Sequence, residues 1–199
     1  MDVTIRLCLY IFIITYPFYI YFYSIAADCG VVSMTEWNGS PSQRKVPLSS
    51  PVNIVVVQHT VTPVCISDTE CQNIVNAIRQ YQTAILKFDD IGPSFLVGGN
   101  GKVYKGAGWD LVGAHTLGYN TRAISISFIG DFTDKLPSPE ALDAAQNLLK
   151  CGVDEKHLTA DYHLVGHRQL TNTQSPGDSL QKHIESWPHW LDNAKETLK

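Results

Sequence analysis

The sequence predicts a single α/β domain, and two observations indicate this class. The chain has 199 residues, of which 44% are hydrophobic and 17% are charged, a composition that suits one globular domain with a substantial core. Short β-branched runs are interspersed with longer segments of helical periodicity, as in domains that build strands and helices around one sheet. The formal net charge of -4 predicts no basic surface, so we expect neither nucleic acid nor an anionic membrane as a partner.

Residues 1–26 are typical of a secretory signal peptide and are excluded from the predicted fold. Arg6 precedes an apolar and aromatic run, Leu7 to Tyr23, and Ser24-Ile25-Ala26 has small residues at the first and third places of a cleavage site. An uncleaved membrane anchor is the alternative. A helix over this run would be only roughly 26 Å long, marginal for a bilayer core, and Pro17 would interrupt it. We therefore expect a secreted protein whose mature domain is residues 27–199.

The cysteines agree with an oxidising compartment. Cys8 leaves with the signal peptide, and an even number in a secreted chain favours disulfides. Cys65 and Cys71 are close in sequence and could close a small loop, which leaves Cys29 to pair with Cys151. Four free thiols are the alternative, which an oxidising compartment disfavours.

The first half of the domain predicts a strand, a helix and a hairpin after an irregular lead-in over residues 30–50. Ile54–Val57 is a β-branched run that predicts a buried strand. Ser67 with Glu70 resembles a capping box, which predicts the start of a helix over residues 68–87. Apolar residues recur at helical spacing in it: Ile74, Ala77, Ile78 and Tyr81. Residues 94–105 contain two strand-like runs around a Gly/Asn turn and predict a hairpin.

The second half predicts two more strands and two more helices. Residues 123–129 alternate small and large side chains and predict a central strand. Ser138-Pro139-Glu140 supplies an N-cap, a first-turn proline and a carboxylate, so a helix is expected from there until Gly152 ends it. Residues 162–165 predict a short strand, and residues 176–187 a final helix.

Four histidine-bearing segments lie at predicted strand ends or in loops, where functional sites are commonly built. Any one histidine alone is more often a surface or satisfied core residue than a ligand. Taken together, the four make a candidate site: His59, His115, His167 and His189.

A series of motifs is spread over about residues 30–190: residues 54–60, 90–92, 106–115, 118–120, 126–130, 141–152, 166–169, 173–177 and 187–190. In collinear order they resemble the peptidoglycan recognition proteins, above all their short, secreted insect-type members. This family is related to bacteriophage and bacterial N-acetylmuramoyl-L-alanine amidases. The resemblance implies a mixed β-sheet flanked by three helices and a groove that holds a muramyl peptide. In active members, two histidines and one cysteine hold a zinc ion, and zinc-bound water cleaves the bond to L-alanine with help from a tyrosine.

The sequence departs from the active pattern at the metal site. Gln58 stands where active members have the first histidine ligand, Ser175 stands where they have the cysteine, and Pro93 replaces the tyrosine. Only His167 matches a ligand. A carboxamide oxygen is a weak donor for zinc, and a serine hydroxyl stays protonated near neutral pH. We therefore expect no metal, no cofactor and no amidase activity.

What remains by resemblance is a binding groove. Gln82 stands where many members have histidine. For Trp109 a core position is an equally good interpretation. The expected walls are His59, Gln82, Trp109, His115, Asn120 and Arg122, with Pro93 beside them and a former metal floor of Gln58, His167 and Ser175.

One position bears on ligand type. Members that prefer diaminopimelate-type peptidoglycan often carry arginine in a Gly-Arg-Gly-Trp motif, where the guanidinium can pair with the extra carboxylate. Here the motif is Gly106-Ala107-Gly108-Trp109, and Ala107 cannot supply that pair. Lysine-type peptidoglycan is therefore the expected preference, although Lys105 lies two residues away.

The sequence thus predicts a secreted, non-catalytic pattern-recognition receptor of innate immunity that binds bacterial peptidoglycan. By resemblance it would act upstream of a Toll-type serine-protease cascade, with other recognition proteins or serine proteases as protein partners. One alternative is a hydrolase in which Ser175 is the nucleophile and His167 or His59 the base. Another is a membrane-tethered receptor, which depends on residues 1–26.

Overall fold

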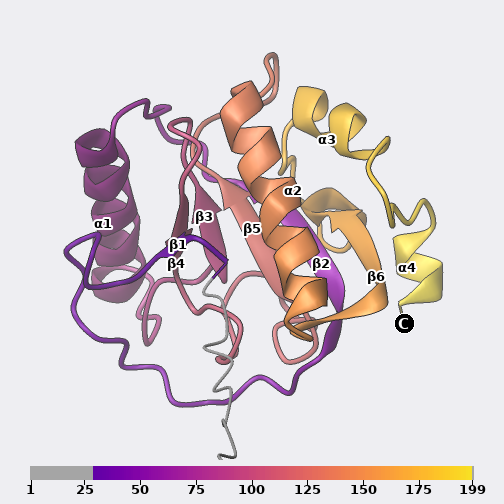
Figure 1. Ribbon diagram of the computed structural model, residues 1–199, viewed down its shortest axis with the longest axis horizontal. Coiled ribbons are helices and arrows are strands. Elements are labelled where there is room, and N and C mark those ends of the chain that lie inside the picture. The colour runs from indigo at the N-terminus through magenta and orange to yellow at the C-terminus, as the bar shows by residue number, and fades with distance from the viewer. Residues whose placement is uncertain (1–28, 199) are drawn as a thin grey trace, which may run out of the picture.

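The computed structural model describes residues 29–198, so the predicted signal peptide lies outside the described residues. The fold is a six-stranded sheet in the order β1-β4-β3-β5-β2-β6, covered by helices (Figure 1). The β3–β4 pair is antiparallel and the other pairs are parallel, which confirms the predicted mixed α/β sheet. The strands are β1 Val31–Val32, β2 Val52–His59, β3 Phe95–Val97, β4 Val103–Lys105, β5 Ile124–Phe128 and β6 Leu158–Gly166.

Three main helices accompany the sheet, as predicted, together with short helical turns. The main helices are α1 Asp68–Ala84, α2 Pro139–Asp154 and α3 Asp178–Ile184, and the short turns are η1 His167–Gln169 and α4 Ala194–Thr197. Neither α4 nor β1 was predicted from the sequence. Strand β1 lies inside the segment that was expected to be irregular, and it pairs with β4. Among residues 29–198, no helix is long and apolar enough to span a membrane.

The helix starts follow the capping residues that the sequence predicted. In α1 the Ser67 hydroxyl accepts from the Glu70 N–H, and the Glu70 carboxylate accepts from the Ser67 N–H, which completes the capping box. In α2 the Ser138 hydroxyl accepts from the Ala141 N–H at 3.2 Å. These bonds join residues only three positions apart, so the start of each helix is marked by local contacts.

Gly152 was expected to end α2, but the helix continues to Asp154. The glycine is needed for packing instead. A Cβ at position 152 would lie 2.7 Å from the Trp109 ring, so only glycine lets the helix approach this tryptophan without a shift.

The two faces of the sheet have different neighbours. Across the sheet, Val57 pairs with Ile126, which pairs with Phe95, and this row packs in the main core with Ala145 and Leu148 of α2. The next row, Gln58, Ser127 and Leu96, points to the other face because strand side chains alternate. On that face Leu96 packs with Cys71 and Val75 of α1. The polar Gln58 therefore lies on the face away from α2.

Both expected disulfides are present, so the alternative of four free thiols is wrong. Cys29 is bonded to Cys151 and ties the start of the domain to α2, while Cys65 and Cys71 close the loop that leads into α1. The first bridge closes the longer chain segment and removes more freedom from the unfolded chain.

A buried ion pair fixes the segment that leads into β3. Asp90 is only 1% exposed, and its carboxylate accepts from the Arg79 guanidinium of α1 at 2.7 and 3.1 Å. Beside it, the Arg44 guanidinium donates to the carbonyls of Asp90, Ile91 and Val112. Burial opposes ionisation of Asp90, but the N–H of Ile91 and the Arg79 guanidinium lower its pKa overall. The network binds the turn before Pro93 to α1 and to the lead-in.

Asp90→Ala is expected to lower the free energy of unfolding by about 3–5 kcal/mol, because it leaves a largely buried guanidinium without its carboxylate. Asp89→Ala removes the neighbouring exposed carboxylate and should change that free energy by no more than about 0.5 kcal/mol. Urea denaturation at pH 7 measures both values. Equal losses for the two variants would show that the pair does not stabilise the fold.

Candidate functional site

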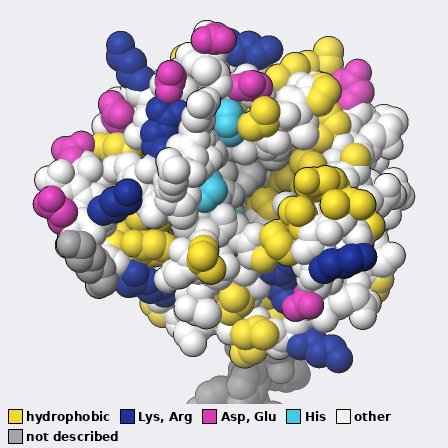
Figure 2. Space-filling view, turned by 180° about the vertical axis from the view of Figure 1, so that it is seen from behind, with side chains coloured by type: hydrophobic (Ala, Val, Ile, Leu, Met, Phe, Trp, Pro, Cys, Tyr) yellow, Lys and Arg dark blue, Asp and Glu magenta, His cyan; other side chains and the backbone are white. Residues whose placement is uncertain are grey.

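The site lies at the carboxyl ends of parallel strands, on the sheet face away from α2. Gln58 and His59 end β2, and His167 follows β6 directly. Because β2, β5 and β6 run parallel, their carboxyl ends meet at one edge of the sheet, a usual place for ligands. Figure 2 shows histidine side chains in a hollow of this face, with hydrophobic side chains gathered along one side.

Two adjoining pockets of about 350 and 430 Å³ form one groove. Cavities of this size suit small ligands. Both pockets are lined by Gln58, His59, Gln82 and Pro93. The first continues over mostly polar residues: Val61, Ala114, His115, Asp131, Thr133, His167, Thr173, Gln174 and Ser175. The second continues along α1 over a more apolar wall: Thr60, Thr62, Pro63, Ile74, Ala77, Ile78, Tyr81 and Ser127.

Gln58 is the structural centre of the groove floor. Its Nε2 donates to the His115 carbonyl at 2.9 Å and to the Thr116 hydroxyl at 3.4 Å, and its Oε1 accepts from the Ser127 hydroxyl at 3.0 Å. The side chain is buried, so these bonds satisfy a carboxamide that would otherwise be costly to bury. They also attach the loop that contains His115 to strands β2 and β5.

Ser175 and His59 hold the neighbouring part of the floor. The buried Ser175 hydroxyl accepts from the backbone N–H of His59 at 3.1 Å. The His59 ring accepts at Nδ1 from the N–H of Phe132 at 3.2 Å, and Asp131 lies 3.7 Å from the same nitrogen. Burial lowers the pKa of His59 although Asp131 opposes that shift. A neutral ring that accepts at Nδ1 carries its proton on Nε2.

His115 and His167 are also uncharged near neutral pH. Burial lowers the pKa of His115 to about 3 and that of His167 to about 4, and for His167 the neighbouring His59 acts in the same direction. His115 Nδ1 lies 3.0 Å from the Thr116 hydroxyl. The Nδ1 of His167 is buried without a hydrogen-bond partner among the residues described. The groove therefore offers neutral imidazoles rather than a cluster of cations.

The donor set of this floor does not fit zinc. A zinc site takes imidazole, thiolate or carboxylate ligands, and here a carboxamide and a hydroxyl accompany His167. The Gln58 oxygen and the Ser175 oxygen already accept hydrogen bonds from protein groups. Within residues 29–198, no three His, Cys, Asp or Glu side chains are grouped so that they could hold a metal ion.

Gln82 and Pro93 lie where the two pockets meet. The Gln82 carboxamide oxygen accepts from the N–H of Gly92 at 2.7 Å, which fixes its direction toward the turn before Pro93. The Pro93 carbonyl in turn accepts from the N–H of Ala107 at 2.9 Å. Pro93 thus gives the groove a rigid apolar edge without a hydroxyl.

Three expected wall residues lie elsewhere. Trp109 is in the main core, stacked on His157 at 4.9 Å and tilted against Phe95 at 4.5 Å, so the core interpretation is the correct one. Asn120 does not line the groove but supports it, because its Oδ1 accepts from the backbone N–H groups of His115 and of the next residue.

Arg122 also lies outside the groove. Its guanidinium donates to the Leu198 carbonyl at 2.5 Å and lies 4.7 Å from the centre of the Tyr119 ring. These contacts hold the C-terminal end of the chain, so the expectation that Arg122 forms a wall is corrected.

The apolar wall on α1 was not predicted from the sequence. The helical spacing of Ile74, Ala77, Ile78 and Tyr81 predicted only a helix, and the structure shows all four lining the groove. The buried residues of α1 are instead Cys71 and Val75. A signal was present, because the apolar residues of this helix cover more than the single stripe that core packing needs.

Known proteins resemble this chain over most of its length. The sequence matches the N-acetylmuramoyl-L-alanine amidase family over residues 48–178. A peptidoglycan recognition protein from Trichoplusia ni is 49% identical, over 90% of this chain and 99% of that protein. Drosophila peptidoglycan recognition protein SA has a solved structure with a TM-score of 0.80 and 45% identity, covering 82% of this chain and 94% of that one. A second solved structure is the ectodomain complex of peptidoglycan recognition proteins LCa and LCx bound to tracheal cytotoxin. The matched chain has a TM-score of 0.80 and 47% identity, and the match covers 81% of this chain and 98% of that one.

The low pKa of His115 predicts a loss of stability in acid. In the unfolded chain histidine takes up a proton near pH 6.5, whereas the folded chain protonates His115 only near pH 3. Between these values the unfolded state binds more protons, so the free energy of unfolding falls as the pH is lowered. Urea denaturation at pH 7, 6 and 5 measures the free energy of unfolding at each pH. This free energy should fall more steeply toward low pH for the unchanged chain than for His115→Asn, and the difference in slope should correspond to at most one bound proton. A titration midpoint of His115 near 6.5 by NMR would contradict this assignment.

Proposed function

This chain belongs to the peptidoglycan recognition protein family, and we propose that it binds the muramyl peptide of bacterial peptidoglycan in the groove without cleaving it. One observation carries the proposal. The groove keeps a continuous hydrogen-bonding floor, yet Gln58 and Ser175 engage their side chains in that floor where active members would hold zinc. The similarity to a complex bound to tracheal cytotoxin supports a ligand of this kind.

The two halves of the groove suit the two parts of a muramyl peptide. The half with neutral imidazoles and the Gln174 carboxamide can donate to and accept from the amides of a peptide stem. The half along α1 presents Ile78 and Tyr81, which can pack against the methyl groups of lactyl and N-acetyl substituents. Tyr81 is 56% exposed and so is available for this contact.

The hydrolase alternative has less support. A serine nucleophile needs a base within hydrogen-bond reach. The Ser175 hydroxyl accepts from the backbone N–H of His59, and the Nδ1 lone pair of the His59 ring accepts from the Phe132 N–H. Within residues 29–198, no hydrogen bond joins Ser175 to the ring of His59 or of His167. A floor that serves binding accounts for these contacts more simply than an active serine does.

The biological setting follows from the family and from the N-terminal sequence. We propose that the chain is secreted and acts as a pattern-recognition receptor of innate immunity, upstream of a Toll-type protease cascade and with its proteases or other recognition proteins as partners. The signal-like residues 1–26 and the two disulfides support an extracellular protein. Sequencing the N-terminus of secreted material tests this, since an intact residue 1 would favour the membrane-tethered alternative.

Lysine-type muropeptide should bind more tightly than the diaminopimelate type, because Ala107 supplies no guanidinium for the extra carboxylate. Tyr81→Ala should weaken binding about tenfold, or roughly 1.4 kcal/mol, since it removes an exposed aromatic from the groove wall. Isothermal titration with the two purified muropeptides measures both effects. Leu117→Ala is the matched control, because Leu117 is 89% exposed and lines neither pocket. A clear diaminopimelate preference would refute the ligand assignment, and equal loss in both variants would refute the α1 wall.

The unchanged chain should carry no stoichiometric zinc and release no L-alanine from polymeric peptidoglycan. Gln58→His combined with Ser175→Cys places two imidazoles and a thiolate around the floor and should bind about one zinc per chain. Elemental analysis after dialysis against buffered zinc measures the difference, with Ser175→Cys alone as the control. Zinc in the unchanged chain, or its release of L-alanine, would overturn the non-catalytic assignment.

A further inference from the structure

The chain contains a single acceptor sequence for asparagine-linked glycosylation, Asn38-Gly39-Ser40. An asparagine followed two residues later by serine or threonine is a short pattern that often matches by chance. It becomes informative where the asparagine lies on a surface loop of a protein that passes through the secretory pathway. The place of Asn38 in the fold therefore decides whether the pattern is meaningful.

Asn38 lies in a tight turn whose backbone is held by the core. Its N–H donates to the Thr35 carbonyl at 3.2 Å. The preceding Trp37 ring is fully buried, and its indole N–H donates to the Lys105 carbonyl at 2.9 Å. A Cβ on Gly39 would lie 2.4 Å from the Trp37 ring, so a larger residue would not fit there without a shift. The turn is thus a fixed surface feature anchored on its buried tryptophan.

The acceptor side chain itself faces solvent. Asn38 and Ser40 are both exposed. Within residues 29–198, the Asn38 carboxamide makes one hydrogen bond, from its Nδ2 to the Gln72 Oε1 at 3.5 Å. A bond of that length is weak, so the fold loses little when a group is attached to this nitrogen. The φ of Asn38 is 63°, a left-handed conformation that asparagine adopts more readily than most residues and that is typical of turns.

Helix α1 separates this turn from the groove. The turn packs on one side of the helix, where the Asn76 carboxamide donates to the Trp37 carbonyl at 2.8 Å. Ile74 and Ile78, which line the groove, are each two positions from Asn76. Two positions along an α-helix correspond to a rotation of about 200°, so the groove lies on the opposite side of α1. In Figure 1 the indigo lead-in passes along α1 at the edge of the molecule.

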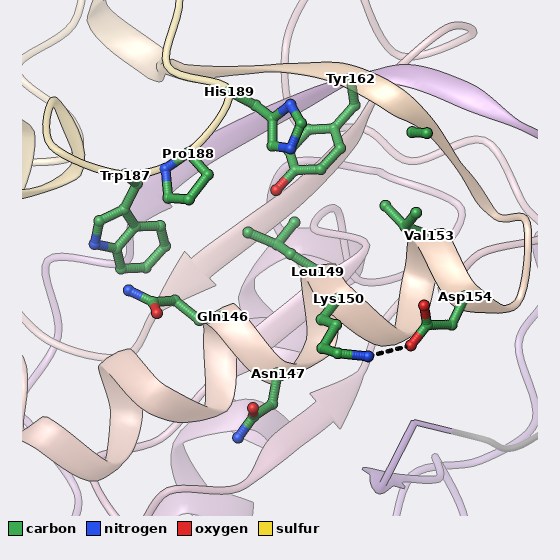
Figure 3. A pocket seen from close by; sticks show the side chains of 11 residues that line it. Gln146, Asn147, Leu149, Lys150, Val153, Asp154, Tyr162, Trp187, Pro188 and His189 are labelled. Atoms are coloured by element: carbon green, nitrogen blue, oxygen red, sulfur yellow. Dashed lines mark hydrogen bonds and ion pairs between the residues drawn. The ribbon is translucent and has the colours of Figure 1, made fainter.

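A group on Asn38 would also leave a second pocket uncovered. This pocket of about 380 Å³ lies between α2, β6 and the turn after α3, and Leu149, Tyr162 and Trp187 are among its lining residues (Figure 3). No residue from 33 to 40 lines this pocket or the groove. The turn is therefore a place where a bulky group is compatible with ligand binding.

We propose that Asn38 carries an asparagine-linked oligosaccharide in the secreted protein. The proposal rests on the secretion proposed above, and the two disulfides agree with that compartment. The co-reactant is an oligosaccharide carried on a polyprenyl diphosphate. The Asn38 Nδ2 bonds to C1 of the first sugar while the bond from C1 to the diphosphate oxygen breaks. The diphosphate leaves with the electron pair, and the amide nitrogen loses one proton to a base.

Secretion of the full chain from insect cells, followed by intact-mass and peptide mass spectrometry, tests the proposal. The secreted chain should be heavier than its sequence, with the added mass on the Asn38 peptide. Peptide N-glycosidase should remove that mass and convert Asn38 to aspartate. Asn38→Gln and Ser40→Ala should each lack the added mass, whereas Ser40→Thr should keep it. Asn193→Gln changes an exposed asparagine outside the acceptor sequence and should also keep it.

Two further readouts on the same material separate the possible failures. N-terminal sequencing shows whether residues 1–26 were removed. An unmodified Asn38 in secreted chain overturns the glycosylation and leaves secretion standing, whereas a chain that is not secreted and not glycosylated overturns both. Muropeptide affinity should agree within about twofold before and after removal of the glycan. A glycosylated chain that binds muropeptide only after this removal would overturn the placement of Asn38 away from the groove.

Discussion

The hydrogen bonds of Gln58 are the interaction on which the groove depends. One carboxamide joins the end of β2 to Ser127 of β5 and to the loop at His115, so it sets the spacing of the groove floor. Its buried donor and acceptor are both satisfied, which makes the arrangement stable without a metal ion. Ser175 extends the same floor through the backbone of His59. Hydrogen bonds between protein groups therefore hold the groove floor together.

The alternation of side chains along the strands gives the two faces of the sheet different roles. The apolar row through Val57 packs against α2, and the polar row through Gln58 opens into the groove. The Asp90 ion pair with Arg79 then joins the turn before Pro93 to α1, which brings the apolar wall up to the polar floor. The groove is thus built from sheet, helix and turn together, and its shape depends on all three.

Much of the fold could be predicted because its signals are local. These signals act through residues a few positions apart: the capping box at Ser67, the N-cap at Ser138, the Gly/Asn hairpin turn and the β-branched run of β2. The strand β1 and the helix α4 could not be predicted, since neither is stable except against its neighbours. Gly152 was misinterpreted for a similar reason, because its role is a close approach to Trp109 across the core.

The sequence by itself determined which chemistry this groove can contain. Gln58, Ser175 and Pro93 are read directly from the chain, and the weak affinity of their side chains for zinc does not depend on the fold. Only the tertiary structure decided which residues face the groove. Trp109 and Arg122 were both expected to form walls of the groove, yet Trp109 packs in the core and Arg122 contacts the C-terminal end. Tyr81, which was not expected there, lines a wall. Periodicity shows that a helix or strand has an apolar face, but what covers that face is set by segments far away in the sequence.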